Sequence, residues 1–129
     1  MAADGTLTGG AFREQYVSDP NIHVAGLNTP PAAVAVVIQD IPAAGTYTLS
    51  VWYENNIAND GLTEPRDMSL LVNGQFAGAL NFAVTNGWYE TNSKVTTTAV
   101  QVPSGSSTFV IACQADDSCH INVWEIELR

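Results

Sequence analysis

The chain has 129 residues, 46% of them hydrophobic and 13% charged, which predicts one domain over residues 1–129 with a hydrophobic core of its own. Four Lys and Arg stand against 13 Asp and Glu, a net charge of −9, so the chain lacks the basic face needed to bind nucleic acid or an anionic membrane surface. The acidic excess is compatible with divalent cations, which prefer oxygen ligands. The longest apolar run, at 32–38, is too short to span a membrane, and the N-terminus lacks the basic and apolar segments of a signal peptide. We therefore expect a module excised from a longer protein.

Short β-rich runs separated by turn residues recur along the chain, and no helical pattern interrupts them. The run at 33–39 is almost continuously apolar, which predicts a strand buried on both faces. The run at 46–53 alternates, with Tyr47, Leu49, Val51 and Tyr53 on one face. The predicted strands are residues 5–12, 23–27, 33–39, 46–53, 68–72, 75–82, 94–102, 107–114 and 121–128.

The arrangement of these runs predicts an all-β sandwich or barrel. The dipeptide Asn73-Gly74 favours the left-handed backbone of a type I′ turn, which predicts a hairpin between the strands on either side of it. The long polar segment at 54–66 is predicted to be a loop of the kind that often carries function. The predicted core positions include Val36, Ile38, Tyr47, Leu49, Val51, Leu71, Val110 and Ile126.

The two cysteines, Cys113 and Cys119, are separated by five residues. This spacing fits neither a zinc site nor the C-x-x-C pattern of redox proteins. We favour a local disulfide that closes the loop between two strands, which implies an oxidising compartment. Two buried free thiols on adjacent strands are the alternative.

Signals for catalysis are weak. The chain has only two histidines, His23 and His120, and it contains no G-x-S-x-G elbow. Asp116 and Asp117 are sequence neighbours, which is no evidence for an acid and a nucleophile facing each other across a cleft. We therefore expect that the chain is not an enzyme.

Aromatic and amide residues in the predicted loops say more about function than the candidate catalytic residues do. Trp88 follows Asn86-Gly87 in a predicted loop, where an indole ring can offer a flat apolar face to a sugar ring. Packing into the core is the alternative interpretation of Trp88. For Trp52 and Trp124, which fall within predicted strands, core packing is the favoured interpretation.

Across nearly its whole length the chain resembles carbohydrate-binding modules of family 35, which are related to family 6. The resemblance implies a β-jelly-roll sandwich whose sugar site lies in the loops at one end. The segments that carry it are ADGTLTGGA at 3–11, HVAGL at 23–27, AGTYTL at 44–49, VWYEN at 51–55, SLLVNG at 69–74, GW at 87–88, VPSG at 102–105 and INVW at 121–124.

The resemblance also implies roles for individual residues. It implies that Trp88 is the aromatic platform and that Asn122 is the polar partner in the last loop. It further places Tyr53 and Asn55 at the sugar, and Arg66 as a basic residue that can pair with a sugar carboxylate.

Some modules of this kind bind uronic acids through a calcium ion. The loops offer Asp19 and Asn21 in one segment, and Asn56 and Asp60 in another, as candidate calcium ligands. Solvated loop charges are the alternative. Two acids that often hold a structural calcium in the family are replaced here by Ala3 and Trp124, so we expect apolar packing at those positions.

The leading hypothesis is a secreted, monomeric, non-catalytic carbohydrate-binding module. It would bind an acidic oligosaccharide or polysaccharide with calcium and direct a covalently attached polysaccharide-degrading domain to its substrate. The alternative is a structural or adhesion sandwich that contacts protein rather than sugar. The exposure of Trp88 beside Asn122 separates the two hypotheses.

Overall fold

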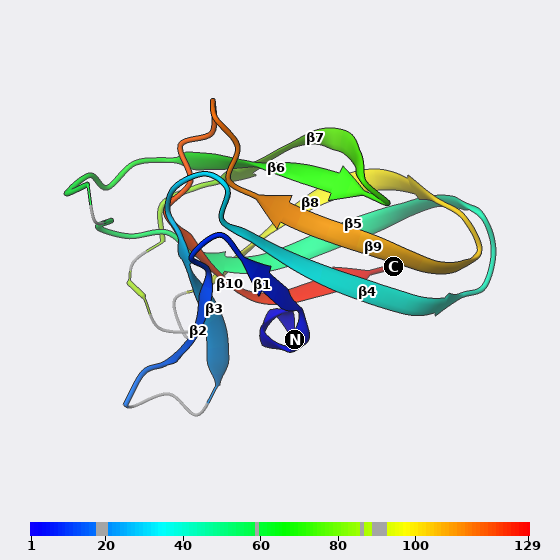
Figure 1. The fold of residues 1–129 in the computed structure, drawn as a ribbon, viewed down its shortest axis with the longest axis horizontal. Helices are drawn as coiled ribbons and strands as arrows, with labels where there is room; N and C mark the ends of the chain where they lie inside the picture. Colours follow the sequence, from blue (N-terminus) through cyan, green and yellow to red (C-terminus); the bar gives the residue numbers. More distant parts are fainter. Residues whose placement is uncertain (18–20, 59, 86, 89–92) are drawn as a thin grey trace.

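The computed structural model describes residues 1–17, 21–58, 60–85, 87–88 and 93–129. Their strands form two antiparallel five-stranded sheets that pack face to face (Figure 1). No helix in this part of the chain is long and apolar enough to cross a lipid bilayer. The elements are η1 (Ala2–Asp4), β1 (Thr6–Thr8), β2 (Phe12–Gln15), β3 (Ile22–Leu27), β4 (Ala33–Ile41), β5 (Gly45–Glu54), β6 (Arg66–Val72), β7 (Gln75–Phe82), β8 (Lys94–Val102), β9 (Gly105–Ala112) and β10 (Ile121–Leu128).

Strands that follow one another in sequence often lie in different sheets. The first sheet has the order β1-β4-β9-β6-β7, and the second has the order β2-β3-β10-β5-β8. β10 is therefore the central strand of the second sheet, where it pairs with β3 on one side and β5 on the other. This arrangement confirms the predicted all-β sandwich of two antiparallel sheets.

The first predicted strand, at 5–12, is in fact divided between the two sheets. Gly9 and Gly10 have φ values of 65° and 100°, in the left-handed region that favours glycine. At Gly9 a side chain is also excluded, since a Cβ would lie 2.5 Å from the carbonyl carbon of Pro31. The chain leaves the first sheet here and enters the second as β2, a strand that the sequence pattern did not predict.

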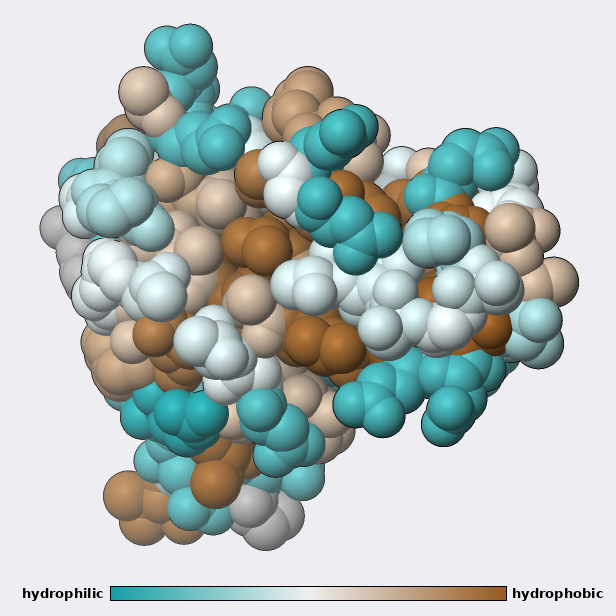
Figure 2. Space-filling model, turned by 45° about the vertical axis from the view of Figure 1, so that its right-hand side comes forward, coloured by the Kyte–Doolittle hydropathy of each residue, from teal (hydrophilic) through white to brown (hydrophobic). Residues whose placement is uncertain are grey.

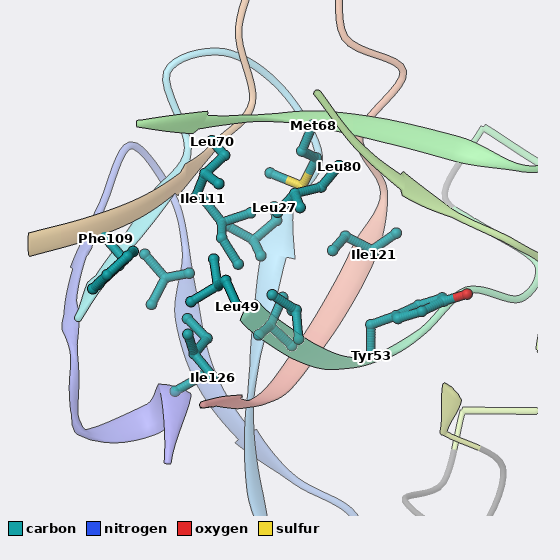
Figure 3. Close-up of a cluster of buried hydrophobic side chains, with 14 of the residues drawn as sticks. Leu27, Leu49, Tyr53, Met68, Leu70, Leu80, Phe109, Ile111, Ile121 and Ile126 are labelled. Carbon is teal, nitrogen blue, oxygen red and sulfur yellow. The ribbon is translucent and has the colours of Figure 1, made fainter. Parts of the chain in front are cut away.

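The hydrophobic core lies between the sheets (Figure 3). The predicted core residues Leu49, Val51 and Ile126 are buried there, and Val36, Ile38 and Tyr47 are partly buried against them. In Figure 3, side chains from both sheets point toward one another. The labelled residues are Leu27, Leu49, Tyr53, Met68, Leu70, Leu80, Phe109, Ile111, Ile121 and Ile126.

Two predicted core positions, Leu71 and Val110, are wrong. They are register partners on β6 and β9, are only half-buried, and lie outside the core cluster, which takes Leu70, Phe109 and Ile111 instead. Both strands are apolar at successive positions, so their composition does not reveal which face points inward.

The strand β4 is also less buried than predicted. Val37 is 55% exposed, so one face of β4 reaches the surface, although the run at 33–39 predicted burial on both faces. Apolar residues are visible elsewhere on the surface too, and Figure 2 shows several of them between hydrophilic neighbours.

The turn between β6 and β7 is the predicted hairpin. Asn73 and Gly74 both have positive φ, at 50° and 82°, and Val72 pairs with Gln75 across the turn. The Asn73 side chain also ties this hairpin to β9, because its Oδ1 accepts a hydrogen bond from the Thr108 amide at 2.9 Å. This turn lies at the opposite end of the sandwich from Arg66, where β6 begins.

The predicted disulfide is confirmed. Cys113 and Cys119 are bonded, with their Cα atoms 5.6 Å apart, and they close the loop between β9 and β10. The loop is also fastened to β6. The Asp117 carboxylate accepts hydrogen bonds from the amide and hydroxyl of Ser69, and the Asp67 carboxylate accepts them from the amide and hydroxyl of Ser118.

We predict that the double variant C113A/C119A folds but is less stable. A cross-link that closes such a short loop contributes on the order of 2 kcal/mol to the free energy of unfolding. Urea unfolding followed by tryptophan fluorescence measures the loss, and reduction of the native protein should lower the midpoint in a similar way. An unchanged midpoint in both experiments would show that the bonds to β6 hold the loop without the disulfide.

Candidate functional site

A cavity of about 230 Å³ lies at one end of the second sheet, where β2, β3 and the start of β10 meet the loops. In Figure 1, β2 and β3 run side by side on the left of the molecule, and β10 starts above them. The residues that line the cavity are Phe12, Glu14, Tyr16, Ala25, Gly26, Asn28, Ile57, Ala58, Trp88, His120 and Asn122.

One wall of the cavity comes from alternate residues of β2 and its end. Phe12, Glu14 and Tyr16 share one side because successive side chains of a strand point to opposite faces. The wall can approach β3 closely because residue 26 is glycine. A Cβ at Gly26 would lie 2.5 Å from the carbonyl oxygen of Gly10 and 2.7 Å from the Phe12 ring.

A stack of three aromatic rings supports this wall from behind. The imidazole of His23 is fully buried, with its ring centroid 4.7 Å from that of Tyr16 and 4.6 Å from that of Trp124. His23 Nε2 lies 2.9 Å from the Glu14 carboxylate. Asn122 Nδ2 donates to the Tyr16 hydroxyl at 3.1 Å. The Glu14 and Asn122 side chains are thus both bonded to members of the stack.

Ala3 and Trp124, where the sequence predicted apolar packing, are 7% and 1% exposed. Trp124 packs on His23 as described above. Near Ala3, Arg13 donates to the carbonyl oxygens of Ala3 and Gly5 at 2.6 and 2.9 Å, so its guanidinium ties the N-terminal turn to β2.

The disulfide loop positions the part of the lining that comes from the start of β10. Cys119 and His120 both have left-handed backbone, with φ values of 56° and 61°. Two backbone hydrogen bonds hold this conformation, from the Cys119 amide to the Asp67 carbonyl and from the His120 amide to the Leu27 carbonyl. The chain then enters β10 with His120 and Asn122 lining the cavity.

Trp88 and Asn122, the two leading sequence candidates, line the same cavity. Trp88 is half-buried and lines the cavity. Asn122 is 9% exposed. The other tryptophans differ, since Trp124 is part of the buried stack and Trp52 is half-buried within β5.

Tyr53 and Asn55, two further sequence candidates, lie outside the lining. Tyr53 packs edge-on against Phe82 in the core, and burial raises the pKa of its hydroxyl. The Asn55 side chain is fully buried and donates to the carbonyl oxygens of Glu64 and Phe82 at 2.8 and 3.0 Å. Asn55 therefore joins the start of the long loop after β5 to the end of that loop and to the end of β7.

Arg66, the predicted cation of the site, is 4% exposed and forms a bidentate ion pair with Asp60. The two nitrogen-to-oxygen distances are 2.8 and 2.9 Å, and Glu64 lies 3.7 Å from the same guanidinium. The hydrogen bonds from Arg66 hold the pKa of Asp60 down, from its ordinary value of 3.8 to about 2. His120 connects this cluster to the cavity, because its Nε2 lies 3.7 Å from Asp60.

The predicted calcium ligands lie in different segments of the chain. Asp60 is paired with Arg66, while Asn21 precedes β3 and Asn56 follows Asn55 in the long loop. Asp19 lies outside the described residues. Within the described ranges there is no group of three or more His, Cys, Asp or Glu side chains that could hold a metal ion. That group of residue types does not include Asn21 and Asn56, and the calcium site stays a prediction.

Sequence reasoning missed four polar residues of the lining: Glu14, Tyr16, Asn28 and His120. The signal for the first two was present, since Phe12, Glu14 and Tyr16 alternate as residues of one strand face do. This alternation was not recognised because the predicted strand ended at residue 12, whereas β2 begins there. Nothing in the sequence pattern indicates that Asn28 and His120, which are distant in the chain, share a cavity.

Several solved structures share this fold, while no protein-family model and no curated protein sequence matches the chain. A family 35 carbohydrate-binding module from Clostridium thermocellum superposes with a TM-score of 0.81 and 21% identity, covering 98% of this chain and 92% of that one. A cycloisomaltooligosaccharide glucanotransferase from Paenibacillus sp., solved with cycloisomaltoheptaose, superposes with a TM-score of 0.82 and 23% identity over 97% of this chain. This chain spans only 17% of that enzyme. At these identities the similarity shows a common fold.

We predict that the ion pair of Asp60 makes stability depend on acid pH. A carboxylate with a lowered pKa contributes stability above its unfolded value of 3.8, and the contribution is lost as the pH falls toward about 2. The urea midpoint of the native protein should therefore fall more steeply over this range than that of Asp60→Asn. Asp116→Asn, which alters an exposed carboxylate, is the control and should keep the native slope. Equal slopes for all three proteins would contradict the role of the pair.

Proposed function

We propose that the chain is a non-catalytic carbohydrate-binding module whose sugar site is the cavity between β2, β3 and β10. The observation that carries the proposal is that Trp88 and Asn122, from distant parts of the chain, line one concave site. A partly accessible indole ring provides an apolar face, and the amide beside it can donate and accept hydrogen bonds. Such a combination suits a sugar ring, which has an apolar face and a rim of hydroxyl groups.

The size and rigidity of the cavity favour a short ligand. Its volume of about 230 Å³ lies below the roughly 300–1,000 Å³ of sites for drug-sized molecules, so a single sugar residue would fill much of it. The aromatic stack behind β2 and the disulfide loop beside β10 hold the polar groups before a ligand arrives. Preorganisation of this kind lowers the entropic cost of binding.

The remaining sequence candidates have supporting roles in this proposal. Asn55 and Arg66 stabilise the long loop that brings Ile57 and Ala58 to the cavity, and Tyr53 packs against Phe82 in the core. Their contribution to sugar binding would therefore be the position of this wall rather than a direct hydrogen bond.

We further propose that the module works within a larger secreted protein that acts on polysaccharide. Two observations support this. The structural relatives include segments of larger carbohydrate-active enzymes, such as the glucanotransferase described above. The disulfide suits an oxidising, extracellular compartment. A tethered module would raise the effective concentration of the attached domain at its substrate.

We predict that Trp88→Ala and Asn122→Ala each weaken sugar binding by at least about tenfold without unfolding the protein. Phe76→Ala is the matched control for the tryptophan, since Phe76 is 66% exposed on the hairpin strand β7, outside the cavity. Asn81→Ala, on an exposed position of β7, is the control for the asparagine. Titration calorimetry against an oligosaccharide array measures the affinities. Absence of any sugar ligand would favour the structural or adhesion module instead.

The sequence-based prediction of a uronic acid bound through calcium is tested separately. Glucuronic and galacturonic acids are titrated into the protein with calcium and then with EDTA. If the prediction holds, affinity for both acids falls sharply on chelation because the ion would bridge protein and sugar carboxylates. Equal affinity in calcium and in EDTA would remove calcium from the proposal and leave the sugar-binding role standing.

A further inference from the structure

The charge around the cavity is negative. Glu14 contributes a carboxylate to the lining, and its side chain is 41% exposed. Behind His120, the carboxylates of Asp60 and Glu64 outnumber the single guanidinium of Arg66. A ligand in the cavity therefore meets Glu14 directly and a net negative cluster beyond His120.

None of the four Lys and Arg residues of the chain lines the cavity, and each donates a hydrogen bond elsewhere. Arg13, on β2 beside Glu14, donates to the N-terminal turn. Arg66 is neutralised by Asp60. Lys94 donates to the carbonyl oxygen of Val84, and Arg129 pairs with Glu127 at the C-terminus. The lining has no permanent positive charge with which to receive an anionic sugar.

The Glu14 carboxylate is also held in place. Its Oε2 lies 2.9 Å from Nε2 of the buried His23, which is fixed between two aromatic rings. Asn122 is fixed in the same way through the Tyr16 hydroxyl. The cavity thus presents a positioned anionic acceptor next to a positioned amide, with the Trp88 ring in the same lining.

We propose that the ligand of this cavity is an amino sugar, whose ammonium group pairs with Glu14. This inference rests on the proposed sugar-binding function and names its ligand class. An ammonium group offers three donors to a carboxylate, and such charge-assisted hydrogen bonds are about twice as strong as neutral ones. The net charge of −9 attracts a cationic polysaccharide at long range, whereas a uronic acid meets Glu14 as a like charge.

The test compares four methyl glycosides by titration calorimetry at pH 6, in low salt with EDTA: glucosaminide, N-acetylglucosaminide, glucoside and glucuronide. We expect the glucosaminide to bind at least about tenfold more tightly than the glucoside and the acetylated sugar, because only the glucosaminide carries a charge that pairs with Glu14. The glucuronide should bind most weakly. The preference should shrink as salt is added, since salt screens a partly exposed charge pair.

The variant Glu14→Gln should lose the preference for the glucosaminide and retain binding of the glucoside. Glu125→Gln is the matched control, because Glu125 is exposed on β10 outside the cavity and its loss changes the net charge equally. Circular dichroism and the urea midpoint confirm folding. The ranking of the four glycosides by the native protein tests the proposal even if Glu14→Gln does not fold.

The possible outcomes are distinguishable. If none of these glycosides binds and the oligosaccharide array also yields no ligand, the proposed sugar-binding function itself fails. If sugars bind but the glucoside equals the glucosaminide, or the glucuronide is preferred, the amino-sugar inference is overturned and sugar binding stands. A preference that survives in Glu14→Gln, or disappears equally in Glu125→Gln, would overturn the role of Glu14.

Discussion

The irregular pairing of β10 is the constraint on which the site depends. β10 is hydrogen-bonded on both sides, yet Trp124 is an extra residue opposite β5, because Val123 pairs with Tyr53 while Glu125 pairs with Trp52. This bulge lets Val123 and Ile126 both enter the core while Trp124 stacks on His23 instead. A regular strand could not do this, since its side chains alternate strictly.

Ring contacts link the bulge to the cavity. Trp124 lies at the bulge and Tyr16 lines the cavity, with His23 between them. Trp124 supports His23, and His23 supports both Tyr16 and Glu14. Two polar groups of the cavity wall, Glu14 and Asn122, are thus held by contacts with His23 and Tyr16. The cations of the chain fasten loops and termini elsewhere, so the electrostatic character of the cavity is set by its carboxylate.

Much of the fold could be predicted from local pattern. Alternation in β5, the Asn73-Gly74 turn and the short cysteine spacing each express a constraint that acts within a few residues. Where neighbouring residues are all apolar, as around Leu71 and Val110, local pattern does not specify the inward face. The choice there depends on register between strands that are distant in sequence. The break at Gly9 was invisible for the same reason, since it is the nearby backbone of Pro31 that excludes a side chain.

The sequence by itself determined the chemical types available to a site: loop aromatics, amides, a large excess of acids and one closely spaced pair of cysteines. It could not determine which of them meet. Arg66 has the chemistry to receive a sugar carboxylate, but the fold buries it against Asp60, where desolvation favours a paired charge. Glu14 carried no recognisable motif, and only the pairing of β2 with β3 placed it in the cavity. Tertiary structure decided the charge of the cavity because the pairing of β2 with β3 places Glu14 in it and the folded loop before β6 pairs Asp60 with Arg66, and local sequence encodes neither arrangement.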